Sequence, residues 1–244
     1  MFSKKDLQKL IVPLIIEQFL AITIGMADTV MVASCGEAAV SGVSLVDSIS
    51  ILIINIFAAL ATGGAVVAAQ YLGRREEEQA CFSAKQLILC TTAISAVIMV
   101  MFLIFGRQLI ALIFGKVDPE VLASAQTYLF ITSMSYPFIA LYNSCAALYR
   151  AMGNSRISMV TSLIMNSLNI VGNAILIYGA GIGVMGAALA TLIARMVSAL
   201  VMVVLLSKKD NPLCITTPGC MHPQKDVIGK ILKIGIPSGI ENGM

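Results

Sequence analysis

The chain has few charged residues and few of the residues that usually carry enzyme chemistry. Only 12% of its 244 residues are charged, against roughly 25% in a soluble domain. It contains no tryptophan and a single histidine, His222, and its 6 cysteines include no Cys-x-x-Cys pair. With no His/Cys/Asp metal cluster and no nucleophile–base pair in the sequence, we expect neither an enzyme nor a bound cofactor. The net charge of +3 is spread over loops, which does not favour a nucleic-acid-binding patch.

Long apolar runs dominate the sequence instead. Hydrophobic residues make up 58% of the chain, and the strict polar–apolar alternation of a membrane β-barrel is absent. We predict an all-α membrane protein with six spanning helices, at about 10–33, 46–70, 87–114, 121–148, 157–179 and 182–206. Gly63 and Gly64 would allow close helix approach in the second span, and Tyr136-Pro137 would bend the fourth.

Basic residues gather in alternate loops and predict the orientation of the chain. The opposite loops hold only Arg107 and Lys116. By the positive-inside rule, the N-terminus of a multi-pass protein of the cytoplasmic membrane would then lie in the cytoplasm. The basic residues on that side are Lys4, Lys5, Lys9, Arg74, Arg75, Lys85, Arg150, Arg156, Lys208, Lys209, Lys225, Lys230 and Lys233.

A weak internal repeat begins near the end of the sequence. Lys230 to Asn242 resembles the start of the first span, because Pro237 and Glu241 repeat the spacing of Pro13 and Glu17. Repeats in transporters mark two halves around a central site. We therefore expect a six-helix lobe at 1–206, a cytoplasmic linker at 207–226 and the start of a second repeat at 227–244. The second lobe, beyond residue 244, would be the missing partner of this one.

Asp28 is an acid within the first apolar span. A charged residue near the centre of a membrane helix costs about 2.5–3.5 kcal/mol on insertion scales, and such residues often mark ion or proton pathways. Counted from the helix ends, Asn173 and Thr191 fall at the depth of Asp28, with Asn169 one turn deeper. These side chains offer carboxylate, amide and hydroxyl oxygens, which suit a hard cation such as Na⁺. A proton on Asp28 is the alternative occupant, and asparagines can also serve simply to pack helices.

Two further charged residues lie inside spans. Arg195 is one turn from Thr191 on the same face, so its long side chain could pair with Asp28 and make that acid structural. Glu17 lies about one-third of the way in from the cytoplasmic end of its span. It is expected either to contact polar groups at an inner gate or to fix the first helix in place.

Taken together, these residues resemble the multidrug and toxic compound extrusion (MATE) transporters. The resemblance runs through the whole chain in order, and no single motif carries it. The matching segments are Pro13-xxx-Glu17-Gln18 with Asp28-Thr29, Gly64 with Ala69-Gln70-Tyr71-Leu72-Gly73, Asn143 with Ala147 to Asn154, Asn169 to Gly179, and Gly183 to Thr191.

The resemblance implies twelve helices in two six-helix lobes that export organic, often cationic compounds against an inward Na⁺ or H⁺ gradient. It maps the family's cation site onto Asp28, Asn169, Asn173 and Thr191, with Glu17, Asn143 and Arg195 as gate or accessory residues. Many members carry a second aspartate at Asn173, so Asp28 is expected to be the only acid of the site, and both coupling ions stay open. A lipid or polysaccharide flippase of related architecture is the alternative, although few basic residues lie within the spans.

Overall fold

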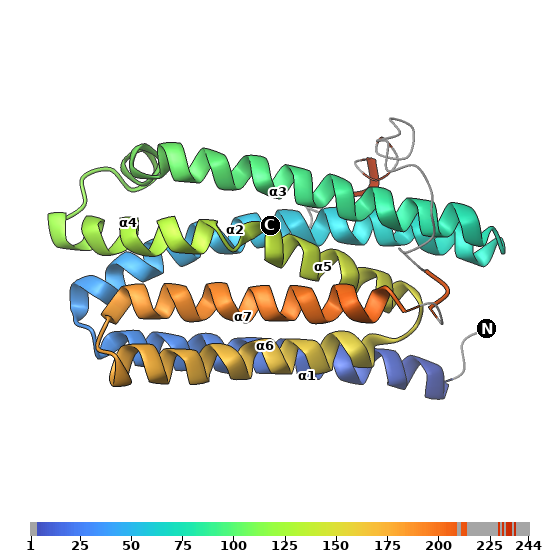
Figure 1. Cartoon of the computed structure of the whole chain (residues 1–244), viewed down its shortest axis with the longest axis horizontal. Coiled ribbons are helices and arrows are strands. Elements are labelled where there is room, and N and C mark those ends of the chain that lie inside the picture. Colours follow the sequence, from blue (N-terminus) through green and yellow to red (C-terminus); the bar gives the residue numbers. More distant parts are fainter. Residues whose placement is uncertain are drawn as a thin grey trace.

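The described part of the protein is a bundle of helices that run along one common direction (Figure 1). The computed structural model describes residues 4–208, 211–213, 229, 231, 233–235 and 237, and none of them forms a strand. This confirms the expected all-α membrane fold. The elements are α1 (Lys4–Ala33), α2 (Glu37–Gly73), α3 (Glu77–Phe114), α4 (Pro119–Ser133), α5 (Tyr136–Ala151), α6 (Ser155–Asn173), the π-helical segment η1 (Ala174–Gly179) and α7 (Gly183–Leu206).

Five helical segments are long and apolar enough to cross a bilayer: residues 11–33 of α1, then α2, α3, α6 with η1, and α7. The fourth expected span, 121–148, is wrong as a single helix. It breaks at Met134 and Ser135 into α4, of 15 residues, and α5, of 16 residues. Each piece is about 23 Å long, too short to span the ~30 Å hydrocarbon core alone. The two follow one another along the bundle (Figure 1).

Proline explains where the second piece begins. Pro137 lies at the first turn of α5, where its missing N–H breaks no helical hydrogen bond. The predicted bend is therefore a real interruption, placed just ahead of the proline. Ser135 lies in that interruption, and its side chain is fully buried.

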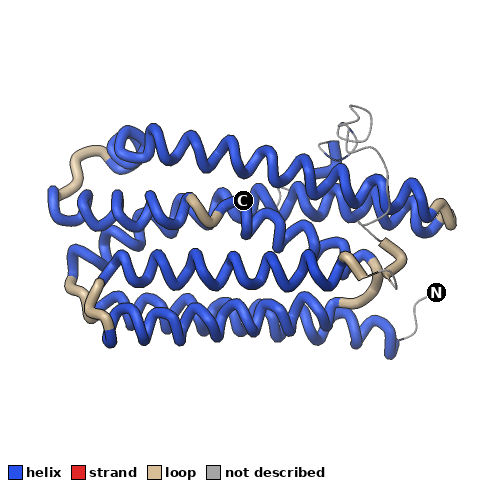
Figure 2. Tube along the Cα trace, viewed as in Figure 1, coloured by secondary structure: helices blue, strands red, loops and turns tan. Residues whose placement is uncertain are grey.

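Short turns connect the helices at the two ends of the bundle (Figure 2). Gly36 and Gly153 have φ angles of 107° and 78°, a backbone conformation that glycine adopts without steric cost. The α1–α2, α3–α4 and α6–α7 connections lie at one end, and the α2–α3 and α5–α6 connections at the other (Figure 2). Asp28 and Thr191 are therefore near the same end, as counting residues along the sequence predicts.

Helix α2 packs mainly against α3, α4 and α5. Small residues make these contacts close. A Cβ added at Gly64 would lie 2.3 Å from Leu87 Cδ1 in α3, and one added at Gly63 would lie 2.6 Å from the backbone nitrogen of Gly235. The expected role of both glycines in close helix approach is confirmed.

An aromatic cluster fills the space behind the α4–α5 break. Tyr136, fully buried, makes edge-to-face contacts with Phe57 of α2 and Phe102 of α3, at ring-centroid distances of 6.4 and 5.8 Å. The Tyr136 hydroxyl is 3.2 Å from Ser50 Oγ. These contacts hold the start of α5 in place and thereby fix the position of Ser135.

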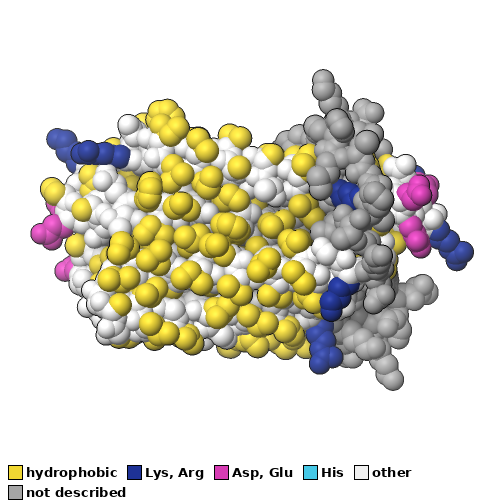
Figure 3. Space-filling model, viewed as in Figure 1, with side chains coloured by type: hydrophobic (Ala, Val, Ile, Leu, Met, Phe, Trp, Pro, Cys, Tyr) yellow, Lys and Arg dark blue, Asp and Glu magenta, His cyan; other side chains and the backbone are white. Residues whose placement is uncertain are grey.

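Apolar side chains cover the visible side of the bundle, whereas charged side chains gather at its two ends (Figure 3). Phe19, Val97 and Leu112 are 70% or more exposed. A broad apolar belt between two charged ends is what a bilayer requires of a spanning protein. The expected linker at 207–226 and repeat at 227–244 fall largely outside the described residues.

Candidate functional site

Asp28 of α1 is held by α6 through a short hydrogen bond. Asn173 Nδ2 donates to Asp28 Oδ1 at 2.6 Å. Asn173 is only 1% exposed, whereas Asp28 is half-buried. The bond joins residues 145 positions apart in the sequence, so packing of α1 against α6 creates it. The structure thus brings together two of the predicted site residues.

Asn169 and Thr191 complete the group around this carboxylate. Asn169 and Thr191 Oγ1 are in hydrogen-bond contact at 3.0 Å. The amide orientation that gives both ends of Asn169 a complementary partner lets its nitrogen donate to both Asp28 oxygens, at 2.7 and 3.0 Å, while its oxygen accepts from Thr191. All four predicted residues therefore form one connected cluster between α1, α6 and α7.

Local helix geometry explains why two asparagines reach one acid. Asn169 and Asn173 are four residues apart, so they lie on the same face of α6. The helix then widens into η1 directly after Asn173, and Ala180 N donates to Ile175 O at 2.8 Å, five residues back. Such π-helical segments are frequent at functional sites. Asn173 is thus the last α-helical residue before a change of helix type.

One oxygen of this cluster has no hydrogen-bond partner. Asn173 Oδ1 is buried and unpaired, and an unsatisfied buried carbonyl costs free energy. A hard cation close to Asp28 would give this oxygen a partner, because amide and carboxylate oxygens are preferred ligands of such ions. The residues present therefore fit a Na⁺ ion, with Asp28 supplying the negative charge.

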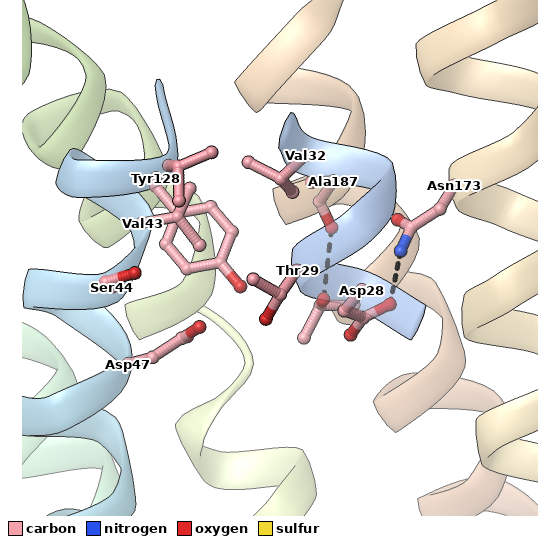
Figure 4. Close-up of a pocket in the computed structure, with 11 residues that line it drawn as sticks. Asp28, Thr29, Val32, Val43, Ser44, Asp47, Tyr128, Asn173 and Ala187 are labelled. Carbon is pink, nitrogen blue, oxygen red and sulfur yellow. Dashed lines mark hydrogen bonds between the residues drawn. The ribbon is translucent and has the colours of Figure 1, made fainter. Parts of the chain in front are cut away.

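A second acid lines the same pocket. Asp28, Thr29, Tyr128 and Asn173 line it together with Asp47 of α2. Figure 4 shows Asp47 across the pocket from Asp28, with the Tyr128 hydroxyl directed into the space between them. The expectation that Asp28 is the only acid here is therefore wrong. Asp47 was not predicted as a site residue, because it lies at the edge of the second expected span, where an acid is common.

Arg195 does not form the direct ion pair with Asp28 that was considered. Its Nη1 donates instead to Ser135 Oγ at 2.7 Å, in the break between α4 and α5. The sequence did not predict this hydrogen bond between Arg195 of α7 and Ser135 in the helix break.

The remaining two predicted residues lie away from this pocket. Glu17 Oε2 accepts a hydrogen bond from Ser158 Oγ at 3.0 Å, so Glu17 ties α1 to the start of α6. Asn143 lies in α5, and its buried Nδ2 has no hydrogen-bond partner. Neither residue is among those that line the pocket around Asp28.

Comparison with known proteins gives one family. The MatE family profile matches residues 13–175. The chain is 30% identical to the uncharacterized transporter YisQ of Bacillus subtilis, over 94% of this chain and 50% of that protein. It is 26% identical to the multidrug export protein MepA of Staphylococcus aureus, over 93% of this chain and 50% of MepA. The chain thus spans about half the length of the curated relatives it matches.

Solved structures agree with the sequence relatives. A MATE transporter described in its bent conformation superposes with a TM-score of 0.90 at 26% identity, covering 98% of this chain and 53% of that one. A transporter of the MOP superfamily from Pyrococcus furiosus gives a TM-score of 0.89 at 26% identity, covering 97% and 52%. These neighbours share the arrangement of the helices that surround Asp28.

Proposed function

The chain belongs to the MATE family of transporters, and we propose that it forms the N-terminal lobe of a cation-coupled antiporter that exports organic, often cationic compounds. The second lobe would follow this one in the full-length protein. A cytoplasmic N-terminus is part of the proposal. It is supported by Arg74 and Arg75 in the α2–α3 connection and by Arg150 and Arg156, which flank the α5–α6 connection at the same end of the bundle.

The observation that carries this proposal is the cluster around Asp28. The carboxylate of Asp28, within a spanning helix, accepts a hydrogen bond from Asn173 and lies beside Asn169 and Thr191. One buried amide oxygen, Asn173 Oδ1, lacks a hydrogen-bond partner. An ionisable group inside a bundle usually serves transport or ion coupling. The cluster offers Na⁺ a set of oxygen ligands, and it offers a proton the Asp28 carboxylate.

Coupling would follow from differential affinity. Asp28 and Asn173 lie on different helices, α1 and α6, so a cation bound between them favours arrangements that keep those helices together. An organic cation bound between the two lobes would favour another arrangement. A ligand shifts a conformational equilibrium only as far as its affinities for the two states differ. Cation entry on one side could then drive substrate release on the other.

The flippase alternative is not favoured. The relatives that match are described as a transporter and as multidrug export proteins. Among the described residues, two acids and no basic side chain line the pocket. A pocket with more acids than bases suits a cationic substrate better than an anionic lipid headgroup.

Asp28→Asn in the full-length transporter tests the proposal. This change keeps the size of the side chain and removes its charge, so we expect export of a fluorescent cation such as ethidium to be lost. The amount of protein in the membrane should stay at the wild-type level. Glu37→Gln is the matched control, because Glu37 is exposed at the start of α2. Wild-type export by the Asp28→Asn variant would reject the role of this acid.

A further inference from the structure

A cavity of about 180 Å³ lies between α3 and α4, which run side by side (Figure 1). It is separate from the pocket around Asp28, because no residue lines both. We propose that this cavity binds one phospholipid with a negatively charged headgroup. The lipid phosphate contacts Arg107, a glycerol ester contacts Gln126, and an acyl chain follows the apolar wall. That wall is formed by Phe102, Leu103, Ile104, Gly106, Leu129 and Phe130.

The cavity faces the region that lipid would occupy. Helix α3 packs mainly against α2, α5 and α4, and it forms one edge of the described bundle (Figure 1). Two residues of the cavity wall, Ile104 and Phe130, are 61% and 55% exposed. Exposed apolar side chains at the edge of a spanning bundle contact acyl chains, so a lipid can reach the cavity from this side.

Gln126 supplies a donor that the protein leaves unpaired. Its Nε2 is buried and has no hydrogen-bond partner among the described residues. The bilayer core holds no water to satisfy such a group, and acyl chains have no acceptor atom. An ester carbonyl of a glycerophospholipid is an acceptor. Gln126 lines the cavity, and the last torsion of a glutamine side chain is soft, so its amide can turn toward an ester that enters there.

Arg107 lies at the level of the lipid headgroups. Helix α3 has 38 residues, which gives a length of about 57 Å. When this helix is centred on a hydrocarbon core ~30 Å thick, about 13 Å of it extends beyond the core at each end. Arg107 precedes Phe114, the last residue of α3, by seven positions (114 minus 107), or about 10 Å. Arg107 is therefore outside the hydrocarbon core, in the layer that contains phosphate and ester groups.

The charge of Arg107 favours an anionic lipid. Its side chain is exposed, and none of the described acids forms an ion pair with it. The nearby charged residues Lys116, Asp118 and Glu120 do not line the cavity. A guanidinium matches the geometry of a phosphate group with paired N–H donors. Arg107 is the one charged residue among the described residues that line the cavity, so a headgroup with one net negative charge, such as that of phosphatidylglycerol, neutralises it.

Lipid titration of the purified full-length transporter tests this proposal. Its measurement is the rise in melting temperature (Tm) as phosphatidylglycerol is added in detergent, compared with phosphatidylcholine of the same acyl chains. In the wild type, the concentration that gives half of this rise should be several-fold lower for phosphatidylglycerol. One basic residue near an anionic headgroup contributes a factor of about five, so Arg107→Gln should raise that concentration about fivefold and remove the preference. Lys116→Gln is the matched control and should keep it, because Lys116 is exposed but does not line the cavity.

Gln126→Leu separates the ester contact from the headgroup charge. Both lipids carry the same esters, so this variant should require a higher concentration of each, while the preference for phosphatidylglycerol remains. Inorganic phosphate should leave the Tm of the wild type unchanged, because it has no acyl chain to fill the apolar part of the cavity.

Several outcomes would overturn the inference. Equal responses of the wild type to the two lipids would do so, as would a response to inorganic phosphate as large as that to phosphatidylglycerol. An Arg107→Gln variant that keeps the wild-type preference, or a Lys116→Gln variant that loses it, has the same consequence. Unchanged concentrations in Gln126→Leu would also reject the site, and this variant decides alone if Arg107→Gln does not fold.

Discussion

Gly42 of α2 is the position at which one added methyl group should disturb the pocket from a distance. A Cβ at Gly42 would lie 2.8 Å from the backbone nitrogen of Ala125 and 2.8 Å from the backbone oxygen of Val121, both in α4. Real Cβ atoms essentially never lie closer than 3.0 Å to such atoms, and ordinary van der Waals contact begins at 3.4 Å, so α4 would have to move away. Backbone atoms cannot rotate aside as the end of a side chain can.

Two opposing free-energy terms set the size of the effect. Overpacking in a tight interface costs about 1–3 kcal/mol. Alanine gains about 0.8–1.0 kcal/mol over glycine inside a helix. Gly25→Ala in α1 receives the same gain without a clash, because no atom lies within 4 Å of its added Cβ. Gly42→Ala should therefore be less stable than Gly25→Ala by about 1–3 kcal/mol.

Unfolding in mixed micelles measures this difference directly. The chain has no tryptophan, so far-ultraviolet circular dichroism during a titration with sodium dodecyl sulfate is a better signal than intrinsic fluorescence. Tyr128 lies one turn beyond Ala125 on α4, so Gly42→Ala should also weaken cation-driven export while Gly25→Ala leaves it unchanged. Equal stability of the two variants would refute the argument that close approach of α2 and α4 builds the pocket wall.

Three further predictions concern single contacts. Thr191→Val removes the hydroxyl that contacts Asn169 at 3.0 Å. We expect the increase in thermal stability that NaCl gives relative to choline chloride to be several-fold smaller in this variant, whereas Thr191→Ser should keep the full increase. Ser135→Ala removes the acceptor of the 2.7 Å bond from Arg195; a hydrogen bond to a charged group is worth about 1.5–3 kcal/mol, so a Tm unchanged from wild type would contradict its role. Glu17→Gln should cost only about 1 kcal/mol, since an amide oxygen can still accept from Ser158, and a complete loss of export in that variant would show that Glu17 does more than tie α1 to α6.

The sequence predicted well how far along its helix each site residue lies. A helix rises by a constant amount per residue, so the positions of Asn173 and Thr191 relative to the helix ends sufficed to place them level with Asp28. Their bonds in the structure agree with that estimate. Depth alone does not say which helices are neighbours, so it could not show that Asp47, at the edge of an expected span on α2, lies across a pocket from Asp28.

The hydrogen-bond partner of Arg195 could not be predicted from the sequence, for a different reason. Pro137 predicts a bend, because its missing N–H and its ring disturb a helix. The sequence does not say whether the helix bends smoothly or breaks, since packing of Tyr136 against Phe57 and Phe102 decides that. In that break, Ser135 Oγ accepts a hydrogen bond from Arg195 Nη1. The known effect of proline on a helix thus predicted where the helix would be irregular, and tertiary packing determined that it breaks there.

Spacing along α2 is the signal that could have found Asp47. Residues three or four apart lie on one face of a helix. Val43, four residues before Asp47, and Ser50, three residues after it, are both buried. An acid on the inward face of a spanning helix indicates a polar site between helices, and Asp47 does line the pocket across from Asp28. Reading the face as well as the depth of each intramembrane acid therefore extends depth counting from single helices to the bundle.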